Sequence, residues 1–349
     1  MSIVNSRRSR DLYSIFSQGF ERVVAAQRRT FGTAYDSYRD QWSRAERREI
    51  LTPVPLQLDI DLASRCNMSC RYCNGMPYIL RGEEYRINLQ LLRLRLDEAV
   101  GRGIRSLNFG NGAEPLLTAD EMFPLISHAR SLGVIDLFVH SNGLLLSRRM
   151  SRKIIEANVT FLCISLDALR EETYSRYGRK GFPAILENID GFLEQRRLAK
   201  SDTPGLRISF LPTTDNIGEL DDFIYQWKDK ADKIDIQSVI DLDKSFNLDR
   251  IPGFIKFSPA CVSPWTRMAI WPNNSYGVCC QPFCLSQSGG MNNGSLADKS
   301  IAQAWQSSLM NRVRTGLISD DAVTACVKCL DSYYRYDEDK IATGDHDRQ

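Results

Sequence analysis

The sequence lacks the features of a membrane protein, a secreted protein or a nucleic-acid-binding protein. Its 349 residues hold no apolar run near the length of a membrane span, and the N-terminus has no apolar signal core. The formal net charge is only +2, so the composition shows no overall basic footprint for nucleic acid. With 43% hydrophobic and 25% charged residues, the chain suits one large or two moderate globular domains.

Cysteine, by contrast, is abundant. Ten cysteines is a high number for a cytosolic protein of this size, and they cluster with the spacings C-x3-C-x2-C and C-x2-C. Such clustering favours metal binding over a disulfide framework. Oxygen-sensitive metal clusters need a reducing compartment, so the simplest prediction is the cytoplasm of a bacterium or an archaeon.

The densest cysteine cluster is the triplet Cys66, Cys70 and Cys73. A cubane [4Fe–4S] cluster is normally held by four thiolates, so three thiolates leave one iron open to an outside ligand. The alternatives are a zinc site or a disulfide framework, but zinc ligands usually come as C-x2-C pairs. Alternating apolar residues over 56–62 predict a strand just before the triplet. The cysteine loop therefore leaves the C-terminal end of a strand, where α/β barrels place their chemistry.

This triplet resembles the cluster motif of the radical S-adenosylmethionine (SAM) superfamily. The resemblance implies that the amino and carboxylate groups of SAM chelate the open iron. An external donor such as flavodoxin or ferredoxin then supplies the electron that cleaves SAM to methionine and a 5′-deoxyadenosyl radical. Tyr72 occupies the aromatic position before the third cysteine, which in the family packs near the adenine.

Alternating strand and helix patterns follow from residue 56 to about 240. Six strands are predicted, over 56–62, 106–109, 135–139, 160–166, 206–211 and 234–240. Helical periodicity separates them, over 89–100, 122–132, 149–157, 171–199 and 217–231. This order predicts an α/β fold with a parallel sheet and right-handed crossovers. Six units fit the partial (β/α)6 TIM-like barrel of the family.

The chain divides into four predicted parts. Residues 1–52 are a basic extension, predicted to be helical because Leu12, Ile15, Phe16, Phe20 and Val23 recur at helical spacing. We expect this helix to pack on the outside of the core, the alternative being a membrane-surface or substrate-docking helix. The other parts are a radical SAM barrel, a small α+β auxiliary cluster domain and a flexible tail, at residues 53–240, 241–340 and 341–349 respectively.

Polar residues follow most of the predicted strands, and the family resemblance assigns them to SAM. The run from Gly110 to Pro115 resembles the family's Gly-Gly-Glu-Pro motif, with Gly112 and Glu114 in the cofactor-binding positions and Ala113 where a glycine is usual. The further SAM contacts implied are Ser141, Asn142, Ser165 and Asp167. Each alone is more often a turn or cap residue, but their order along the chain supports one cofactor site.

His140 is the candidate catalytic residue, as an acid–base group or a hydrogen-bond partner of the substrate. The alternative is a histidine that only bonds to local backbone. The loop over 214–216 and Gln237 on the last strand are weaker candidates for the same site.

A second cysteine set lies beyond the barrel. It comprises Cys261, Cys279, Cys280, Cys284, Cys326 and Cys329. With a Gly before Cys279 and a helix carrying Trp305, this region resembles the C-terminal SPASM/twitch extension of radical SAM enzymes. No cysteine follows Cys329, so the shorter twitch form fits better.

The resemblance implies an auxiliary [4Fe–4S] cluster on four of these thiols: Cys261, Cys279, Cys326 and Cys329. Four thiolates saturate a cluster, which should then store or pass an electron. The alternative is a zinc ribbon. Cys280 and Cys284 are left as packing thiols, alternative ligands or hydrogen donors.

These observations predict a radical SAM oxidoreductase with two [4Fe–4S] clusters that oxidises a small-molecule alcohol, such as a sugar or cyclitol. The auxiliary cluster would accept the electron of the substrate radical. The alternative is a maturase that epimerises or crosslinks a ribosomally made peptide. The N-terminal 50 residues are shorter and more helical than the usual winged leader-binding domain of that class. A third class, a non-catalytic iron–sulfur or zinc protein, does not explain the set of SAM-contact positions.

Overall fold

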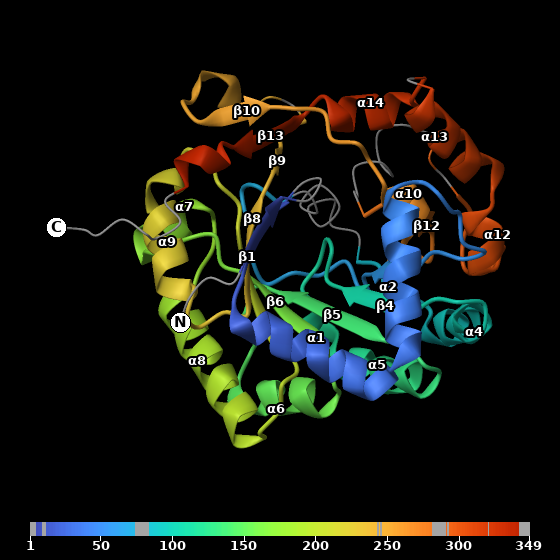
Figure 1. The fold of residues 1–349 in the computed structure, drawn as a ribbon, viewed down its shortest axis with the longest axis horizontal. Coiled ribbons are helices and arrows are strands. Elements are labelled where there is room, and N and C mark those ends of the chain that lie inside the picture. The colour runs from blue at the N-terminus through green and yellow to red at the C-terminus, as the bar shows by residue number, and fades with distance from the viewer. Residues whose placement is uncertain are drawn as a thin grey trace.

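The protein is a mixed α/β structure in which helices cover a large curved sheet (Figure 1). This computed structural model describes residues 5–8, 12–73, 84–242, 244, 246–280, 291, 293–319 and 321–341. Cys284, His346 and the predicted tail beyond Ile341 lie outside the described residues. Among the described helices, none is both long and apolar enough to cross a membrane.

The six predicted strands form the centre of the sheet, in the order β8-β7-β6-β5-β4-β3 and all parallel to their neighbours. Their bounds are Gln57–Ile60 (β3), Ser106–Phe109 (β4), Asp136–Ser141 (β5), Phe161–Ser165 (β6), Gly205–Phe210 (β7) and Lys233–Gln237 (β8). The helices between them are Leu89–Val100 (α4), Ala119–Ser131 (α5), Arg148–Glu156 (α6), Glu171–Arg176 (α7), Phe182–Leu198 (α8) and Leu220–Trp227 (α9). Short 3₁₀ turns occur at Pro115–Thr118, Ile217–Glu219, Leu248–Arg250 and Glu338–Lys340. The predicted α/β partial barrel is confirmed, and the sheet does not close on itself.

The two faces of the central sheet differ in chemistry. Because side chains alternate across a strand, one face carries Leu107 of β4 and Leu137 of β5, both fully buried in the main hydrophobic core with the surrounding helices. The other face, called the inner face below, carries polar or charged residues: Gln57, Asp59, Ser106, Asn108, Asp136, His140, Arg207, Ser209, Lys233 and Asp235. Parallel strands buried between two apolar layers are hydrophobic on both faces, so this sheet has a function beyond packing on its inner face.

The predicted N-terminal helix is wrong for residues 12–16. Residues Asn5–Arg8 (β1) and Leu12–Phe16 (β2) form an antiparallel hairpin, and β2 pairs antiparallel with β8 at the sheet edge. The Ser17 side chain then caps the first helix by accepting a hydrogen bond from the Gly19 amide, 3.1 Å away. A short apolar run is compatible with both the helical and the strand period. Here the hydrogen bonds to β8 stabilise the strand.

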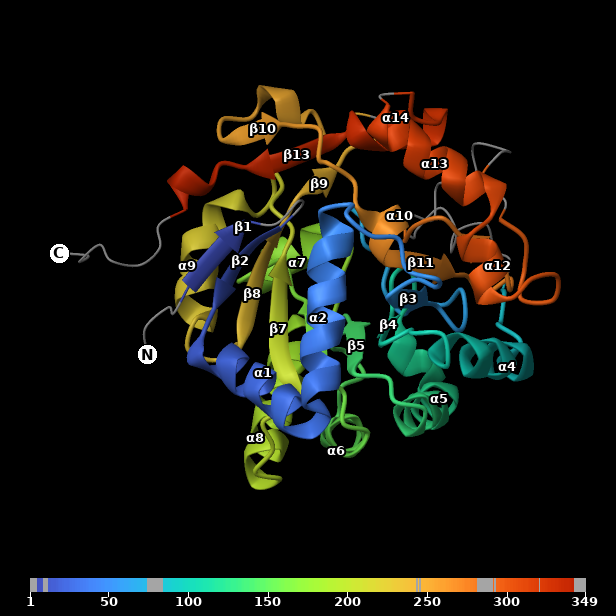
Figure 2. The same ribbon diagram turned by 45° about the vertical axis from the view of Figure 1, so that its right-hand side comes forward.

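Two N-terminal helices, Gln18–Phe31 (α1) and Thr33–Glu46 (α2), pack across the inner face rather than on the outside of the core (Figures 1 and 2). The Gln27 amide of α1 donates to the Thr160 hydroxyl at 2.6 Å, next to the start of β6. Tyr38 and Trp42 of α2 form a small apolar cluster with Leu56 and Trp265. The extension therefore forms one wall of the space in front of the sheet.

The C-terminal part extends the barrel sheet and arches over the carboxyl ends of its strands (Figure 2). Strand Arg267–Ile270 (β11) pairs parallel with β3, and Tyr276–Gly277 (β12) pairs antiparallel with β11. A separate three-stranded sheet combines Phe254–Lys256 (β10), Tyr333–Tyr336 (β13) and Val239–Ile240 (β9). The helices here are Ser263–Thr266 (α10), Ile301–Trp305 (α12), Ser308–Ile318 (α13) and Thr324–Leu330 (α14). The domain boundaries given above stay predictions.

Candidate active site

The cysteine triplet follows β3 on a loop that is fixed to helix α7. The Arg71 amide donates to the Tyr177 carbonyl at 2.8 Å, and the Cys73 amide to the Cys70 carbonyl at 3.2 Å. Gly178 is required beside this loop, because its φ is 74° and a β-carbon there would stand 2.4 Å from the Ser69 carbonyl oxygen. The loop is thus anchored on both sides of the triplet's second cysteine.

All three triplet thiols line one cavity of about 350 Å³ at the carboxyl ends of the strands. Burial raises the pKa of Cys66 to about 11, and the neighbouring carboxylate of Glu114 and the thiols of Cys70 and Cys73 act in the same direction. Thiols that hold a metal must lose their protons, so cluster binding here would release them. Three thiols on one cavity wall fit the three-thiolate cluster site that the sequence predicts.

The cavity also collects the predicted SAM-contact residues together with His140 and Gln237, whereas the weaker candidates at 214–216 do not line it. Its lining includes Tyr72, Gly112, Glu114, His140, Ser141, Asn142, Ser165, Asp167 and Gln237. These residues come from the ends of β4, β5, β6 and β8 and from the cysteine loop, and a parallel sheet brings such ends to one edge. These candidates therefore share one cavity, while contact of each residue with SAM stays a prediction.

Glu114 is fixed by the protein before any ligand binds. Its carboxylate is 3% exposed and accepts hydrogen bonds from the Ser141 hydroxyl at 2.8 Å, the Asn142 amide at 2.8 Å and the Leu116 amide at 3.1 Å. Burial raises the pKa of Glu114 to about 7, against the lowering effect of these donors. A carboxylate has about four acceptor positions, so one remains for a SAM amino group.

The Gly-rich loop before Glu114 is held by Asp61, a residue that the sequence analysis did not identify. The Asp61 carboxylate accepts from the backbone amides of Asn111 and Gly112, both at 2.9 Å. Gly110 has a φ of 92°, and a β-carbon there would stand 2.3 Å from the His140 carbonyl oxygen. Ala113 is not among the described residues with positive φ, so alanine replaces the usual glycine without backbone strain.

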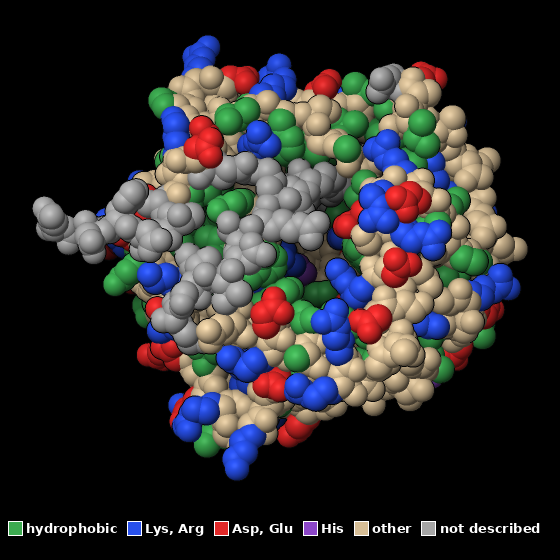
Figure 3. Space-filling model, viewed as in Figure 1, with side chains coloured by type: hydrophobic (Ala, Val, Ile, Leu, Met, Phe, Trp, Pro, Cys, Tyr) green, Lys and Arg blue, Asp and Glu red, His purple; other side chains and the backbone are tan. Residues whose placement is uncertain are grey.

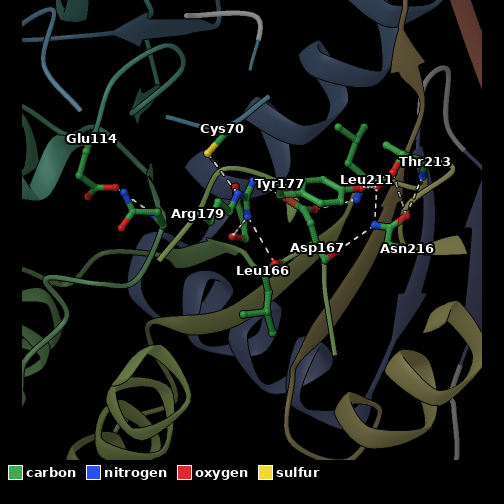
Figure 4. A network of polar contacts seen from close by, with 11 residues as sticks. Cys70, Glu114, Leu166, Asp167, Tyr177, Arg179, Leu211, Thr213 and Asn216 are labelled. Atoms are coloured by element: carbon green, nitrogen blue, oxygen red, sulfur yellow. Dashed lines mark hydrogen bonds and ion pairs between the residues drawn. The ribbon is translucent and has the colours of Figure 1, made fainter. Parts of the chain in front are cut away.

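Arg179 is a second unpredicted residue of the site (Figure 4). Its guanidinium donates to the Cys70 sulfur at 3.1 Å, to the Ser165 carbonyl at 2.8 Å and to the Asp167 carboxylate at 2.6 Å. The Arg179 and Asp167 side chains are only 9% and 4% exposed. No motif surrounds Arg179 in the sequence, so only the fold reveals that it touches a cluster cysteine.

Asp167 and Tyr72 are likewise engaged with the protein. The second oxygen of Asp167 accepts from the Leu211 amide at 2.7 Å, and the backbone there has a φ of 59°. The Tyr72 hydroxyl donates to Asp215 at 2.8 Å, and its ring packs against Phe246 with centroids 4.3 Å apart. These side chains form part of the cavity wall, and Asp167 is already paired with Arg179 there.

The C-terminal part supplies the roof of the cavity. Val239, Ile240, Phe246 and Tyr333 all line it. Tyr333 also lies close enough to the Cys329 thiol, which belongs to the second cysteine set, to influence its pKa. The cavity and the second cysteine set are therefore connected through one side chain.

The four predicted auxiliary ligands lie near one another. Burial raises the pKa of Cys326 to about 12, and the Cys279 and Cys261 thiols add to the effect. Burial is also the largest cause of the raised pKa of Cys329, and the thiols of Cys279, Cys261 and Cys326 add to it. Four neighbouring thiols fit a saturated cubane. Cys280 does not line the cavity.

Two family models match the chain in the regions that carry the two cysteine sets. The radical SAM superfamily matches residues 60–204, and an iron–sulfur cluster-binding domain matches residues 261–330.

Similar proteins agree with this assignment. Molybdenum cofactor biosynthesis protein 1 of Dictyostelium discoideum is 29% identical over 181 residues, 51% of this chain and 27% of that protein. GTP 3′,8-cyclase of Acidothermus cellulolyticus is 32% identical over 142 residues, 38% of each chain. The chain thus spans well under half of these two relatives' own length.

Solved structures share the fold. BtrN in complex with AdoMet and 2-DOIA matches with a TM-score of 0.51 at 14% identity, over 81% of this chain and 94% of that chain. SuiB of Streptococcus suis bound to precursor peptide SuiA matches with a TM-score of 0.56 at 15% identity, over 79% of this chain and 70% of that chain.

The two family models carry the assignment. By them, the chain belongs to the radical SAM superfamily, with a C-terminal iron–sulfur cluster-binding domain, and its cofactors are SAM and two iron–sulfur clusters.

Proposed function

We propose that this radical SAM enzyme oxidises an alcohol carbon of a small molecule, such as a sugar or cyclitol, to a ketone. The observation that supports this most directly is Tyr333, which lines the SAM cavity and lies beside Cys329 of the second cysteine set. An oxidation needs an electron acceptor beside the substrate, and this residue joins the two sites. An external donor such as a flavodoxin or ferredoxin completes the proposal.

When bound, SAM and its cluster supply a 5′-deoxyadenosyl radical that takes one hydrogen atom from carbon. To become a ketone, the alcohol then loses one electron from that carbon and one proton from its hydroxyl group. The protein must therefore offer both an electron acceptor and a proton acceptor at the cavity. The thiols of Cys261, Cys279, Cys326 and Cys329 would hold the first.

His140 is the proposed proton acceptor, because its ring lines the cavity at the end of β5. Burial, together with the charges of Arg207, Arg267 and Lys233, lowers the pKa of His140 to about 3. The imidazole is therefore neutral and has one nitrogen free to accept a hydrogen bond from a substrate hydroxyl. The basicity of His140 would rise only when a negative charge is placed near those cations, because that charge would offset their effect on its pKa.

Two other reactions are the alternatives. Peptide modification rests on the likeness of fold to SuiB, and GTP cyclisation on the names of the sequence relatives. Peptide epimerisation needs a thiol that returns a hydrogen atom to carbon. Cys280 does not line the cavity, and Cys284 lies outside the described residues.

The test uses reconstituted full-length protein, SAM, reduced flavodoxin and a metabolite extract from bacteria grown on perdeuterated glucose. Oxidation predicts deuterium in 5′-deoxyadenosine and a product that has lost one carbon-bound deuterium and one hydroxyl hydrogen. An epimerised product would instead exchange one carbon-bound deuterium for solvent hydrogen. Deuterium transfer that appears only with GTP or with a peptide fraction would overturn the proposal.

Tyr333→Phe provides the internal check on the electron route. We expect this variant to cleave SAM but to form product more slowly, because the hydroxyl that lies beside Cys329 is gone. Unchanged product formation would show that Tyr333 is only part of the cavity roof.

A further inference from the structure

We propose that a second cavity, on the inner face of the sheet, binds an anionic group of the substrate, a carboxylate or a phosphate. The inference rests on the proposed function and narrows its substrate class from alcohols to acidic or phosphorylated alcohols. It is carried by the position of this cavity, by the charges that line it and by buried amide groups that lack partners.

The second cavity measures about 370 Å³ and lies between the inner face and helices α1 and α2. Leu12, Asn111 and His140 line both this cavity and the SAM cavity. A substrate held here reaches the SAM cavity past His140. The face drawn in Figure 3 is hollowed near its centre, with Lys and Arg side chains beside the hollow.

Positive charge exceeds negative charge around the second cavity. Four cationic side chains line it: Arg39, Arg207, Lys233 and Arg267. Arg39 faces Asp136, 4.0 Å away. Arg207 and Lys233 share a single carboxylate, that of Asp235, which is fully buried. With the neighbouring carboxylate of Asp59, which bonds to Asn108, four cations face three carboxylates, and this leaves a formal excess of one positive charge.

Arg267 supplies the charge with the least compensation. Among the described residues, its guanidinium has no hydrogen bond or ion pair with another side chain, and it lies 5.6 Å from the ring centroid of Trp42. A buried or half-buried guanidinium normally finds a carboxylate, phosphate or carbonyl partner. An anionic substrate group would supply that partner.

Among the described residues of the same cavity, two amide side chains each have one buried polar atom without a partner. Asn108 is 5% exposed, and its amide nitrogen donates to Asp59 at 2.9 Å and to Asn111 at 3.0 Å. Within the described residues, the Asn108 carbonyl oxygen and the Asn111 amide nitrogen are buried and have no hydrogen-bond partner. Buried polar groups are nearly always satisfied, so this acceptor and this donor are available for substrate hydroxyl or oxyanion groups.

Aromatic rings from the sheet and from α2 also line this cavity. Tyr38 and Trp42 of α2 face the space together with Phe138 and Phe161 of the sheet. Flat apolar walls of this kind pack against the carbon face of a ring. Cations, hydrogen-bonding amides and aromatic walls together describe a site for a ring-shaped acidic alcohol.

The first test measures anion binding without turnover. Inorganic phosphate and acetate are titrated into the reconstituted protein, with potassium chloride at equal ionic strength as reference, and the unfolding temperature is recorded. Stabilisation by phosphate, acetate or both, beyond that by chloride, is expected because ligands that bind the native state raise its stability. The anion that raises the unfolding temperature more indicates whether the substrate group is a phosphate or a carboxylate.

Three variants make this test specific. Arg267→Met should weaken anion binding about tenfold or more, since a charge-assisted hydrogen bond is lost. Arg267→Lys should restore part of the affinity, because it keeps the charge. Arg102→Met, at an exposed position outside both cavities, should behave like the wild type. No anion-specific stabilisation, or equal stabilisation in Arg267→Met, would overturn the inference.

The second test separates this inference from the proposed function. The deuterated extract is divided on an anion exchanger, and each fraction is assayed for deuterium transfer to 5′-deoxyadenosine. Transfer from the retained, anionic fraction is expected. Transfer from the neutral fraction, with loss of the hydroxyl hydrogen, would leave alcohol oxidation standing and would refute the anionic substrate. Anion binding without alcohol oxidation would refute the proposed function and leave the anion site standing.

Discussion

The two faces of the same sheet are under different physical demands. On β4, Leu107 faces the helices and is fully buried in the main core, whereas the next residue, Asn108, faces the inner cavity with an unpartnered oxygen. The apolar face gains stability by excluding water. The inner face gives up that gain and holds groups that are costly to bury without a partner.

This difference shows that the apolar face of the sheet provides stability, whereas the inner face and the strand ends provide the polar groups for chemistry. Every predicted SAM-contact residue lies at the strand ends or on the loops that follow them, and the inner-face cations lie one or two pleats below. Substitutions on the apolar face should therefore change the free energy of unfolding, and substitutions on the inner face should change ligand binding. The predictions below test this separation, starting with the largest effect.

The largest effect is expected for the triple variant Cys66→Ser/Cys70→Ser/Cys73→Ser. SAM cleavage should be abolished, since no site for the SAM-binding cluster remains. The iron content should fall from about 8 to about 4 per chain, because the C-terminal cluster is retained. Anaerobic reconstitution followed by iron analysis and a 5′-deoxyadenosine assay checks both.

The matched variant is Cys326→Ser/Cys329→Ser, which should lose the other half of the iron and keep SAM cleavage. If each variant lost all of its iron while the fold persisted by circular dichroism, the two cysteine sets would not hold independent clusters.

Breaking the buried pair of Arg179 and Asp167 should have the next largest effect. Arg179→Gln leaves Asp167 buried without its cation, which typically costs about 3–5 kcal/mol of folding free energy. The pKa of Asp167 is already raised by burial and held down by Arg179. Without Arg179 it should rise further, so the variant should lose stability most steeply as pH increases.

The control for that pair is Arg28→Gln. Arg28 contacts Asp36 at 3.0 Å, and the two side chains are 61% and 60% exposed. Solvent screens such a pair, so its loss should cost no more than about 1 kcal/mol. Urea unfolding of both variants at several pH values gives the comparison, and equal costs would contradict the special status of the inner pair.

The sequence was sufficient to predict which strand-end residues share a cavity, but not which partners hold them. Strand ends of a parallel sheet meet at one edge, so the order of Glu114, Ser141 and Asp167 along the chain predicted that they share a cavity. The cysteine spacing likewise predicted that the three thiols of the triplet lie at one place. These features depend on local pattern and topology, and both can be read from the chain.

Partners across the fold could not be predicted in this way. Arg179 reaches Cys70 from 109 residues away, and Asp61 supports a loop 50 residues later. The N-terminal strand was missed because its pairing with β8 spans more than 200 residues, as in Ser14 opposite Asp235. Long-range pairing overrides the local helical period there.

Adjacent residues on β4 allow the two faces to be compared directly. Leu107→Ala should lower the free energy of unfolding by about 2–5 kcal/mol, as expected for a fully buried leucine. Asn108→Ala removes two hydrogen bonds, to Asp59 and to Asn111, and should cost about 1–2 kcal/mol; it should also change anion binding in the cavity that Asn108 lines.

Urea midpoints and the anion titration measure both quantities on both variants. The comparison fails if Leu107→Ala lowers anion affinity at unchanged stability, or if Asn108→Ala unfolds the protein as much as Leu107→Ala does.

The smallest effect is expected for Asp61→Asn and concerns pH. Burial raises the pKa of Asp61 to about 7, although the amides of Asn111 and Gly112 act to lower it. An unfolded aspartate titrates near about 3.9, so the folded pKa is the higher one. Its contribution to stability is therefore fully present below about pH 3.9 and is lost as pH rises through 7.

Asparagine does not titrate, so the two proteins should respond differently to pH. At pH 5 the variant should be less stable, because its amide group can accept from only one of the two backbone donors at Asn111 and Gly112. As pH rises to 8 the wild type loses the contribution of the protonated Asp61, and the gap between the unfolding temperatures should narrow. Parallel profiles across this range would mean that Asp61 stays ionised throughout, and that the Gly-rich loop is held by a carboxylate with an ordinary pKa.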